Sequence, residues 1–277
     1  MTNQPSELKR LEIAGASLSF VDTGSPAPSG ATILLVHGFP LSHAVWNEQI
    51  ALLSKRNRVI APDLRGFGGS TLGEWPSDTE PASLGRYSDD LAELLDDLAP
   101  GGPLLFAGFS MGGYIAFSFM QNHPGRIGGL ALIDTRAIAD DDAARSKRLK
   151  MAEKVGEWGS ARVAEMMRPA LFGSAAPAEA IDETVRVISQ TDPRSIAAAQ
   201  QAMAARPDST PRLVEIGLPT LVLVGESDAI SSAEEMTGIA AQIPGSKLEV
   251  IPGAGHMTPV EKPDAVSKAL GDFAASL

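Results

Sequence analysis

The sequence predicts an α/β protein with a mostly parallel central sheet and helices on both faces. Short apolar runs alternate with segments of helical periodicity along most of the 277 residues. Some of these runs, such as Ile33-Leu34-Leu35-Val36, are apolar at every position. A strand that is apolar on both faces is typical of a parallel sheet covered by helices. The alternation therefore favours a doubly wound sheet.

Seven runs rich in β-branched residues and leucine are predicted as strands. They span residues 18–22, 32–36, 58–61, 104–107, 129–133, 220–225 and 247–251. Segments with apolar residues at helical spacing are predicted as helices at 44–53, 88–98, 111–122, 233–242 and 264–275. Ser232 followed by Glu235 resembles a capping box, which supports a helix start there.

The segment 136–212 differs in character from the rest of the chain. Strand-like runs are missing from it, and Ala, Met, Arg and Glu dominate between prolines at 169, 177, 193 and 207. This composition predicts a helical lid inserted between the strand that ends at Ile133 and the one that begins at Thr220. The expected organisation is a core of residues 1–135 and 213–277 with a cap (lid) of residues 136–212.

Composition limits the classes of partner. With 34 acidic and 23 basic residues the formal net charge is −11, which opposes binding to nucleic acid or to an anionic membrane surface. No apolar stretch approaches the roughly 18 residues that span a bilayer. Residues 1–7 lack the features of a secretory signal, so a cytoplasmic protein, or one supplied in mature form, is expected. The chain has no cysteine, and its acidic residues are dispersed, so no metal site is predicted. A homo-oligomer is compatible with the sequence.

Ser110 is the candidate nucleophile. It lies between Gly108 and Gly112, where the apolar run 104–107 turns into a helical pattern. A serine on a sharp strand-to-helix turn projects its hydroxyl above the sheet, and flanking glycines allow the backbone to double back.

A serine nucleophile needs an imidazole to take its proton. Of the four histidines, His256 follows the strand 247–251 in a glycine-rich loop, and such loops form the sites of open α/β sheets. For His37, His43 and His123 we favour structural roles in loops and at helix ends.

The imidazole in turn needs a carboxylate that fixes its tautomer. Asp228 lies just past the strand 220–225 and is the favoured acid. Asp134, directly after the strand 129–133, is the rival, although it can also be the residue that turns the chain into the lid. Glu226 is the third choice.

Attack on a carbonyl creates an oxyanion that requires aimed N–H donors. The backbone N–H of Met111, at the start of the helix after Ser110, is one expected donor. The second is the N–H of Phe39 in the loop His37-Gly38-Phe39-Pro40.

Together these segments resemble the α/β-hydrolase fold superfamily, in particular capped bacterial carboxylesterases, enol-lactonases and cofactor-free haloperoxidases. The matching segments are 37–40, 62–70, 108–113, 225–228 and 253–256. The resemblance implies an α/β-hydrolase fold with a mostly parallel sheet of about eight strands. Within the segment 62–70, Asp63 and Arg65 are interpreted as structural, with an ion pair and turn contacts.

The resemblance implies acyl transfer without a cofactor. Relatives that dehalogenate alkanes or open epoxides carry aspartate at the elbow, where this chain has Ser110. The main hypothesis is a serine hydrolase of small to medium carboxylic esters. Perhydrolase or haloperoxidase activity, an enol-lactonase and a non-enzymatic ligand receptor stay open. An enol-lactonase would need cations for its substrate's carboxylates, and Arg136, Arg145 and Arg168 are the candidates.

The substrate pocket is expected beneath the lid. Trp46, Trp158 and Met257 are the main candidates for its apolar walls, although core packing explains each equally well. Further candidates of the same kind are Phe39, Met111, Met166, Met167 and Phe172.

Overall fold

The computed structural model describes residues 8–24 and 30–277 of the chain. Its centre is an eight-stranded sheet with the order β1-β2-β4-β3-β5-β6-β7-β8. The strands are β1 (Leu8–Ile13), β2 (Ala16–Asp22), β3 (Thr32–Val36), β4 (Arg58–Pro62), β5 (Leu104–Phe109), β6 (Gly129–Ile133), β7 (Thr220–Gly225) and β8 (Lys247–Ile251).

The six neighbouring strands β4, β3, β5, β6, β7 and β8 are parallel. Only β2 runs antiparallel to its neighbours, β1 and β4. The predicted α/β class with a mostly parallel sheet of about eight strands is confirmed. All seven predicted strands are present, with ends that differ by no more than two residues. The carboxyl ends of β5, β6, β7 and β8 therefore meet at one edge of the sheet, where the candidate site residues follow.

The strand β1 was not predicted. Leu8, Lys9 and Arg10 are exposed, and only Ile13 of this strand is buried. It pairs with β2 alone, at the edge of the sheet. An edge strand with so little buried surface has no apolar run from which it could be recognised.

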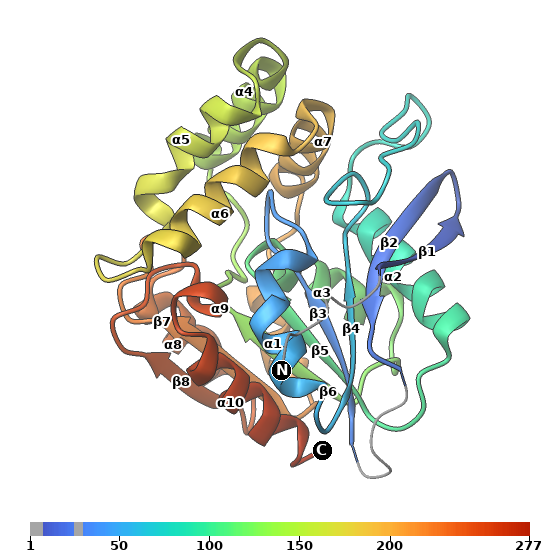
Figure 1. The fold of residues 1–277 in the computed structure, drawn as a ribbon, viewed down its shortest axis with the longest axis vertical. Helices are drawn as coiled ribbons and strands as arrows, with labels where there is room; N and C mark the ends of the chain where they lie inside the picture. Colours follow the sequence, from blue (N-terminus) through green and yellow to red (C-terminus); the bar gives the residue numbers. More distant parts are fainter. Residues whose placement is uncertain (1–7, 25–29) are drawn as a thin grey trace.

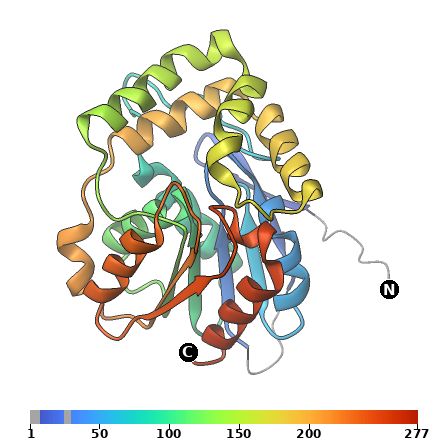
Figure 2. The same ribbon diagram turned by 90° about the vertical axis from the view of Figure 1, so that its left-hand side faces the viewer.

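Helices cover both faces of the sheet (Figure 2). The helices of the described chain, including those of the segment above the sheet, are η1 (His43–Trp46), α1 (Asn47–Leu53), α2 (Leu84–Leu98), α3 (Met111–Asn122), α4 (Asp142–Trp158), α5 (Ser160–Leu171), α6 (Ala178–Gln190), α7 (Pro193–Ala204), η2 (Thr210–Glu215), α8 (Ala233–Gln242), α9 (Thr258–Glu261) and α10 (Pro263–Ala274). The helix α2 begins four residues before its predicted start, because the hydroxyl of Ser83 accepts from the N–H of Arg86 and caps it. Ser232 caps α8 as its sequence pattern predicts.

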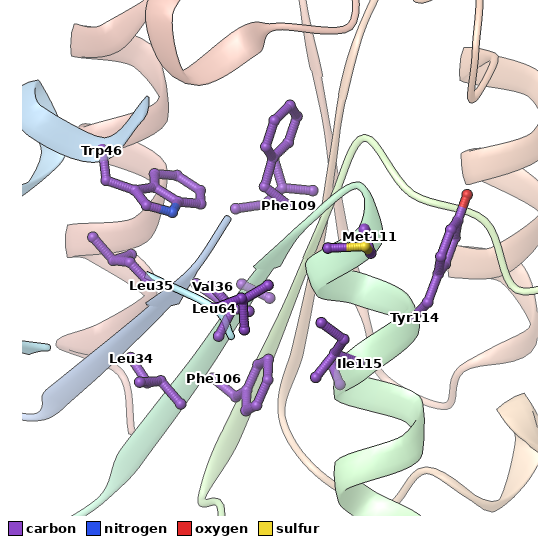
Figure 3. Close-up of a cluster of buried hydrophobic side chains, with 14 of the residues drawn as sticks. Leu34, Leu35, Val36, Trp46, Leu64, Phe106, Phe109, Met111, Tyr114 and Ile115 are labelled. Atoms are coloured by element: carbon purple, nitrogen blue, oxygen red, sulfur yellow. The ribbon is translucent and has the colours of Figure 1, made fainter. Parts of the chain in front are cut away.

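The core lies between the middle strands and the helices on each face. Every residue of β3 and β5 is buried, and the ring of Phe106 in β5 packs against that of Phe119 in α3 with 5.4 Å between centroids. Phe106 and Ile115 both belong to the buried cluster drawn in Figure 3. Burying a leucine or phenylalanine side chain stabilises the folded state by about 1.5–3 kcal/mol relative to leaving it exposed. The strongly packed middle of the sheet gives the loops at its edge a rigid base.

The segment 136–212, which we call the cap, contains α4, α5, α6 and α7 and lies above the carboxyl edge of the sheet (Figure 1). The side chain of Asp140 is buried at the base of the cap, and it accepts from the guanidinium groups of Arg148 at 2.6 Å and Arg206 at 2.8 Å. The N–H of Ser209 donates to the carbonyl of Ala137, so the two chain segments that connect cap and sheet run side by side. Its boundaries as a separate domain stay a prediction.

The prediction that the first residues carry no secretory signal concerns residues 1–7, which lie outside the described part of the chain. Over the ranges 8–24 and 30–277, no helix combines the length and the apolar character needed to cross a membrane.

Candidate active site

Ser110 sits on a sharp turn between β5 and α3. Its φ of 53° is in the left-handed region, which costs a non-glycine residue about 1–3 kcal/mol. Hydrogen bonds hold the turn: the N–H of Ser110 donates to the carbonyl of Ile133, and its carbonyl accepts from Gly113 N–H and Thr135 Oγ1. The side chain stays partly exposed. This geometry places the hydroxyl at the carboxyl edge of the sheet, between β5 and α3.

Two glycines are required by this turn. A Cβ at Gly108 would overlap with the carbonyl group of Gly112, and a Cβ at Gly112 would overlap with the carbonyl oxygen of Val36. The pattern Gly-x-Ser-x-Gly thus reflects the close approach of β3, β5 and α3 around Ser110.

His256 reaches Ser110 from the loop after β8. Its Nε2 lies 3.0 Å from Ser110 Oγ, and the residue is only 3% exposed. The ring of Phe109 packs against the imidazole with 5.3 Å between centroids. The imidazole is therefore held within hydrogen-bond reach of the serine hydroxyl.

Asp228 lies on the other side of the imidazole. Its Oδ2 is 2.8 Å from His256 Nδ1, and its Oδ1 accepts from the N–H groups of Ile230 and Ser231 at 2.7 and 3.0 Å. Burial alone would raise the pKa of Asp228, but the hydrogen bond and charge of His256, with the backbone donors, hold this pKa below its usual value. An ionised Asp228 requires a proton on Nδ1, which leaves Nε2 free to accept from Ser110.

Neither alternative acid is hydrogen-bonded to His256 in the described structure. Asp134 is fully buried, accepts from Gly225 N–H at 2.8 Å and shares a short hydrogen bond with Thr258 Oγ1. Burial, together with the negative charge of Asp228, raises the pKa of Asp134 well above its usual value. Glu226 is exposed and accepts from Gly253 N–H. The geometry favours Asp228 as the partner of the imidazole.

Replacing Asp134 by asparagine should therefore leave ester hydrolysis within about tenfold of wild type. An amide can keep both contacts, because its oxygen can accept from Gly225 N–H and its NH₂ can donate to Thr258 Oγ1, which reverses the hydrogen bond that Thr258 donates to the carboxylate. The measurement is kcat/KM of the Asp134→Asn variant on a p-nitrophenyl ester. A loss of several orders of magnitude in a folded variant would make Asp134 the acid instead.

The loop 37–40 passes directly beside Ser110. A Cβ at Gly38 would lie 3.0 Å from the Cβ of Ser110. His37 fixes the loop, since its Nε2 accepts from Leu64 N–H and its Nδ1 donates to the carbonyl of Gly38. Burial lowers the pKa of His37 to about 4, so the imidazole is neutral, as this pairing requires.

The backbone N–H groups of Phe39 and Met111 have no protein acceptor among the hydrogen bonds found for residues 8–24 and 30–277. Met111 is the first residue of α3, where N–H groups are free of helical partners. Met111 directly follows Ser110, and Phe39 directly follows Gly38, which lies against Ser110. The two N–H groups are thus available for an oxyanion, and this role stays a prediction.

Asp63 and Arg65 are structural, but they do not pair with each other. Asp63 accepts from His43, through both its N–H and its Nδ1 at 2.7 Å. Arg65 forms a two-pronged ion pair with the buried Asp90 of α2. The expected ion pair between Asp63 and Arg65 is therefore wrong, because Arg65 pairs with Asp90 and Asp63 pairs with His43.

The predicted wall residues lie in different environments. Trp46 and Met257 are fully buried, and Trp46 meets the ring of Phe109 edge-on at 6.0 Å (Figure 3). Trp158 ends α4 and is partly exposed, with the guanidinium of Arg162 5.3 Å from its ring. Their part in substrate binding stays a prediction. The same holds for the half-exposed Met166 and the partly buried Met167 and Phe172.

The three arginines considered for an anionic substrate are not gathered at the site. Arg136 donates to Glu235 at 2.7 Å. Arg145 and Arg168 are exposed on α4 and α5. In the part of the chain that the structure describes, no group of three or more acidic or histidine side chains is arranged to hold a metal ion.

Three residues of the site were missed by sequence reasoning. Ser231 Oγ lies 3.0 Å from Asp228 Oδ2, Thr258 binds Asp134, and Glu261 accepts from backbone groups on both sides of His256. The position of Ser231, three residues after Asp228, is a weak signal of a local hydrogen bond. Nothing in the sequence pattern distinguishes Thr258 and Glu261.

Comparison with known proteins adds family information to this geometry. A family model described as the alpha/beta hydrolase family matches residues 33–269, which include Ser110, Asp228 and His256. The curated 2-(acetamidomethylene)succinate hydrolase of Mesorhizobium japonicum is 26% identical, with 96% of this chain and 94% of that protein covered.

Among the solved structures that resemble this chain over nearly its whole length are an esterase and an enol-lactonase. A thermophilic esterase from Thermogutta terrifontis, with malate bound, is 41% identical with a TM-score of 0.89, covering 96% of this chain and 97% of that chain. The enol-lactonase from Burkholderia xenovorans LB400 is 25% identical with a TM-score of 0.83, covering 96% and 99%. The similarity thus extends through the cap as well as the sheet.

Proposed function

This chain belongs to the alpha/beta hydrolase family, and from that premise we propose that it hydrolyses small to medium carboxylic esters through a Ser110–His256–Asp228 triad and an acyl-enzyme intermediate. The observation that carries the proposal is one hydrogen-bonded chain from Asp228 Oδ2 through His256 to Ser110 Oγ, with distances of 2.8 and 3.0 Å. Nucleophile, base and orienting acid recur in this geometry on unrelated folds.

In the acylation step, Ser110 Oγ attacks the ester carbonyl and its proton passes to His256 Nε2. The N–H groups of Phe39 and Met111 donate to the oxyanion that forms, and losing one such donor typically costs about 10²–10³ in rate. His256 then protonates the leaving alkoxide as the C–O bond breaks, which leaves the acyl group on Ser110.

In the deacylation step, His256 removes a proton from water as the water attacks the acyl carbonyl. The tetrahedral intermediate collapses, Ser110 recovers its proton from His256, and the carboxylic acid leaves. The negative charge of Asp228 stabilises the imidazolium that forms twice in this cycle. This chemistry uses only groups of the chain, water and the ester.

The esterase of Thermogutta terrifontis supports the choice of reaction, since it is 41% identical over nearly the whole of both chains. An enol-lactone is itself an ester, so the enol-lactonase relative is compatible with the same chemistry. The positions of Arg136, Arg145 and Arg168 give no support to an anionic lactone.

The proposal is tested with p-nitrophenyl esters of increasing acyl length, mixed rapidly with stoichiometric enzyme. We expect a burst of p-nitrophenol near one equivalent followed by slower turnover, with kcat/KM highest for a short or medium acyl chain. Absence of hydrolysis of every ester by folded protein would contradict the proposal and favour a ligand receptor. Peracid formation that exceeds hydrolysis when peroxide is added would favour a perhydrolase.

Replacing Asp228 by asparagine should lower kcat by about 10⁴-fold. The amide would favour the wrong imidazole tautomer and would remove the charge that stabilises imidazolium. Steady-state kinetics of Asp228→Asn beside Glu226→Gln check this, because Glu226 is an exposed acid of the same loop. Activity of Asp228→Asn near that of wild type would exclude Asp228 as the acid.

A further inference from the structure

Glu261 forms a backbone anchor beside His256 that the chemistry above does not use. It ends the short helix α9, and only 5% of the residue is exposed. Its Oε1 accepts from the N–H groups of Gly255 and Met257, each at 3.1 Å. These two residues flank His256, so one carboxylate holds the backbone on both sides of the imidazole.

The same carboxylate contacts the cap. Oε2 of Glu261 accepts from the N–H of Gly173 at 2.9 Å, and also from Gly255 N–H at 3.1 Å. Gly173 lies just after α5 in the cap. A group on α9 therefore links the loop of His256 directly to a cap segment that is distant in the sequence.

The backbones of cap and loop also touch next to this carboxylate. Met257 N–H lies 3.1 Å from the carbonyl of Leu171, and a Cβ at Gly255 would overlap with the backbone of Phe172 and Gly173. Such close approach leaves the loop of His256 little freedom to move independently of the cap.

We propose that Glu261 is a positioning residue that fixes His256 against Ser110 and ties the imidazole to the cap. This inference rests on the proposed function, since it assigns Glu261 a role in the same site. The position of the cap and the orientation of His256 are then coupled. A substrate that displaces residues 171–173 of the cap displaces His256 as well.

The carboxylate is chemically required at this place. Its two oxygens accept from three N–H groups, and hydrogen bonds to a charged acceptor are about twice as strong as those between neutral groups. A glutamine has one acceptor oxygen, and its NH₂ would face an N–H of either Gly173 or the loop. Glu261→Gln thus preserves shape but removes part of the anchor.

The negative charge of Glu261 also provides a second measurement, the pH–rate profile. A variant that only lost folding stability would not shift this profile. The charged and polar groups around the imidazole are Asp228 and Ser231 at Nδ1 and Ser110 at Nε2, and Asp134 lies near both Asp228 and Glu261. Removing the charge of Glu261 disfavours imidazolium. The acidic limb of the pH–rate profile should move to lower pH in Glu261→Gln.

The experiment compares Glu261→Ala, Glu261→Gln and the control Glu226→Gln on one p-nitrophenyl ester. Glu261→Ala should lose about 10²-fold in kcat with KM little changed, because a displacement of about 1 Å has that effect. Glu261→Gln should lose less and show the shifted acidic limb. Glu226→Gln, which removes an exposed carboxylate bound to Gly253, should stay within about twofold of wild type.

Folded Glu261 variants with wild-type kcat and pH profile would overturn the proposal. If Glu261→Ala does not fold, the isosteric Glu261→Gln decides. If neither folds, hydrogen exchange of the wild type decides: amides of residues 171–173 and 255–257 should exchange together as one unit, and independent exchange of the two segments would overturn the proposal. Failure of the proposed function is seen separately, as a wild-type enzyme without an ester burst.

Discussion

Replacing Ser110 by alanine should reduce kcat for a p-nitrophenyl ester by about 10⁶-fold. The variant lacks the oxygen that forms the acyl-enzyme, and no other hydroxyl among the described contacts lies within hydrogen-bond reach of His256 Nε2. Residual hydrolysis would come from the oxyanion donors and substrate binding alone. Steady-state rates and the loss of the p-nitrophenol burst measure the effect.

The control is Ser227→Ala, which removes an exposed hydroxyl from the loop next to Asp228. It should hydrolyse the ester at the wild-type rate. Both variants should unfold within a few degrees of wild type, because alanine keeps the backbone of each turn. A folded Ser110→Ala enzyme that retains a burst would show that the nucleophile lies elsewhere.

Replacing His256 by alanine should have a similar effect, about 10⁶-fold in kcat. Without the imidazole, the Ser110 hydroxyl keeps its proton and the leaving alkoxide has no acid. The carboxylate of Asp228 would also lose the partner that lies 2.8 Å from its Oδ2. The same ester assay measures the loss, and circular dichroism verifies the fold.

His123→Ala is the matched control for this substitution. His123 follows α3, pairs with Asp89 at 2.9 Å and lies at the opposite end of that helix from Ser110. Its removal should leave kcat unchanged. Comparable losses in His123→Ala and His256→Ala would show that the effect is not specific to the imidazole beside Ser110.

Much of the site could be predicted because its signals are local. The flanking glycines of Ser110 follow from close backbone approach at one turn, where Gly108 and Gly112 have no room for a Cβ. His256 could be selected because a glycine-rich loop follows a predicted strand. Both signals lie within a few residues of the group they identify.

For the acid that orients His256, the sequence allowed only a ranking of candidates. Asp134 and Asp228 follow the neighbouring strands β6 and β7, so both were expected at the same edge of the sheet. What separates them is the path of the loop after β7, which carries Asp228 to His256 while Asp134 stays beneath, bound to Gly225 and Thr258. Sequence spacing does not specify that path.

Long-range partners were beyond prediction for a related reason. Glu261 binds backbone N–H groups from two separate segments, and any residue type can supply such a group. Arg65 was expected to form an ion pair with Asp63, two residues before it, but it pairs with Asp90 of α2. The fold is specified by apolar periodicity, whereas these polar contacts depend on how the elements pack.

Covalent labelling of the wild-type protein with a fluorophosphonate, followed by peptide mass mapping, tests the central claim most directly. One adduct per chain should form, on the peptide that contains Ser110, and labelling should be abolished in Ser110→Ala and strongly slowed in His256→Ala. Folded wild-type protein that stays unlabelled, or an adduct on another residue, would contradict the account.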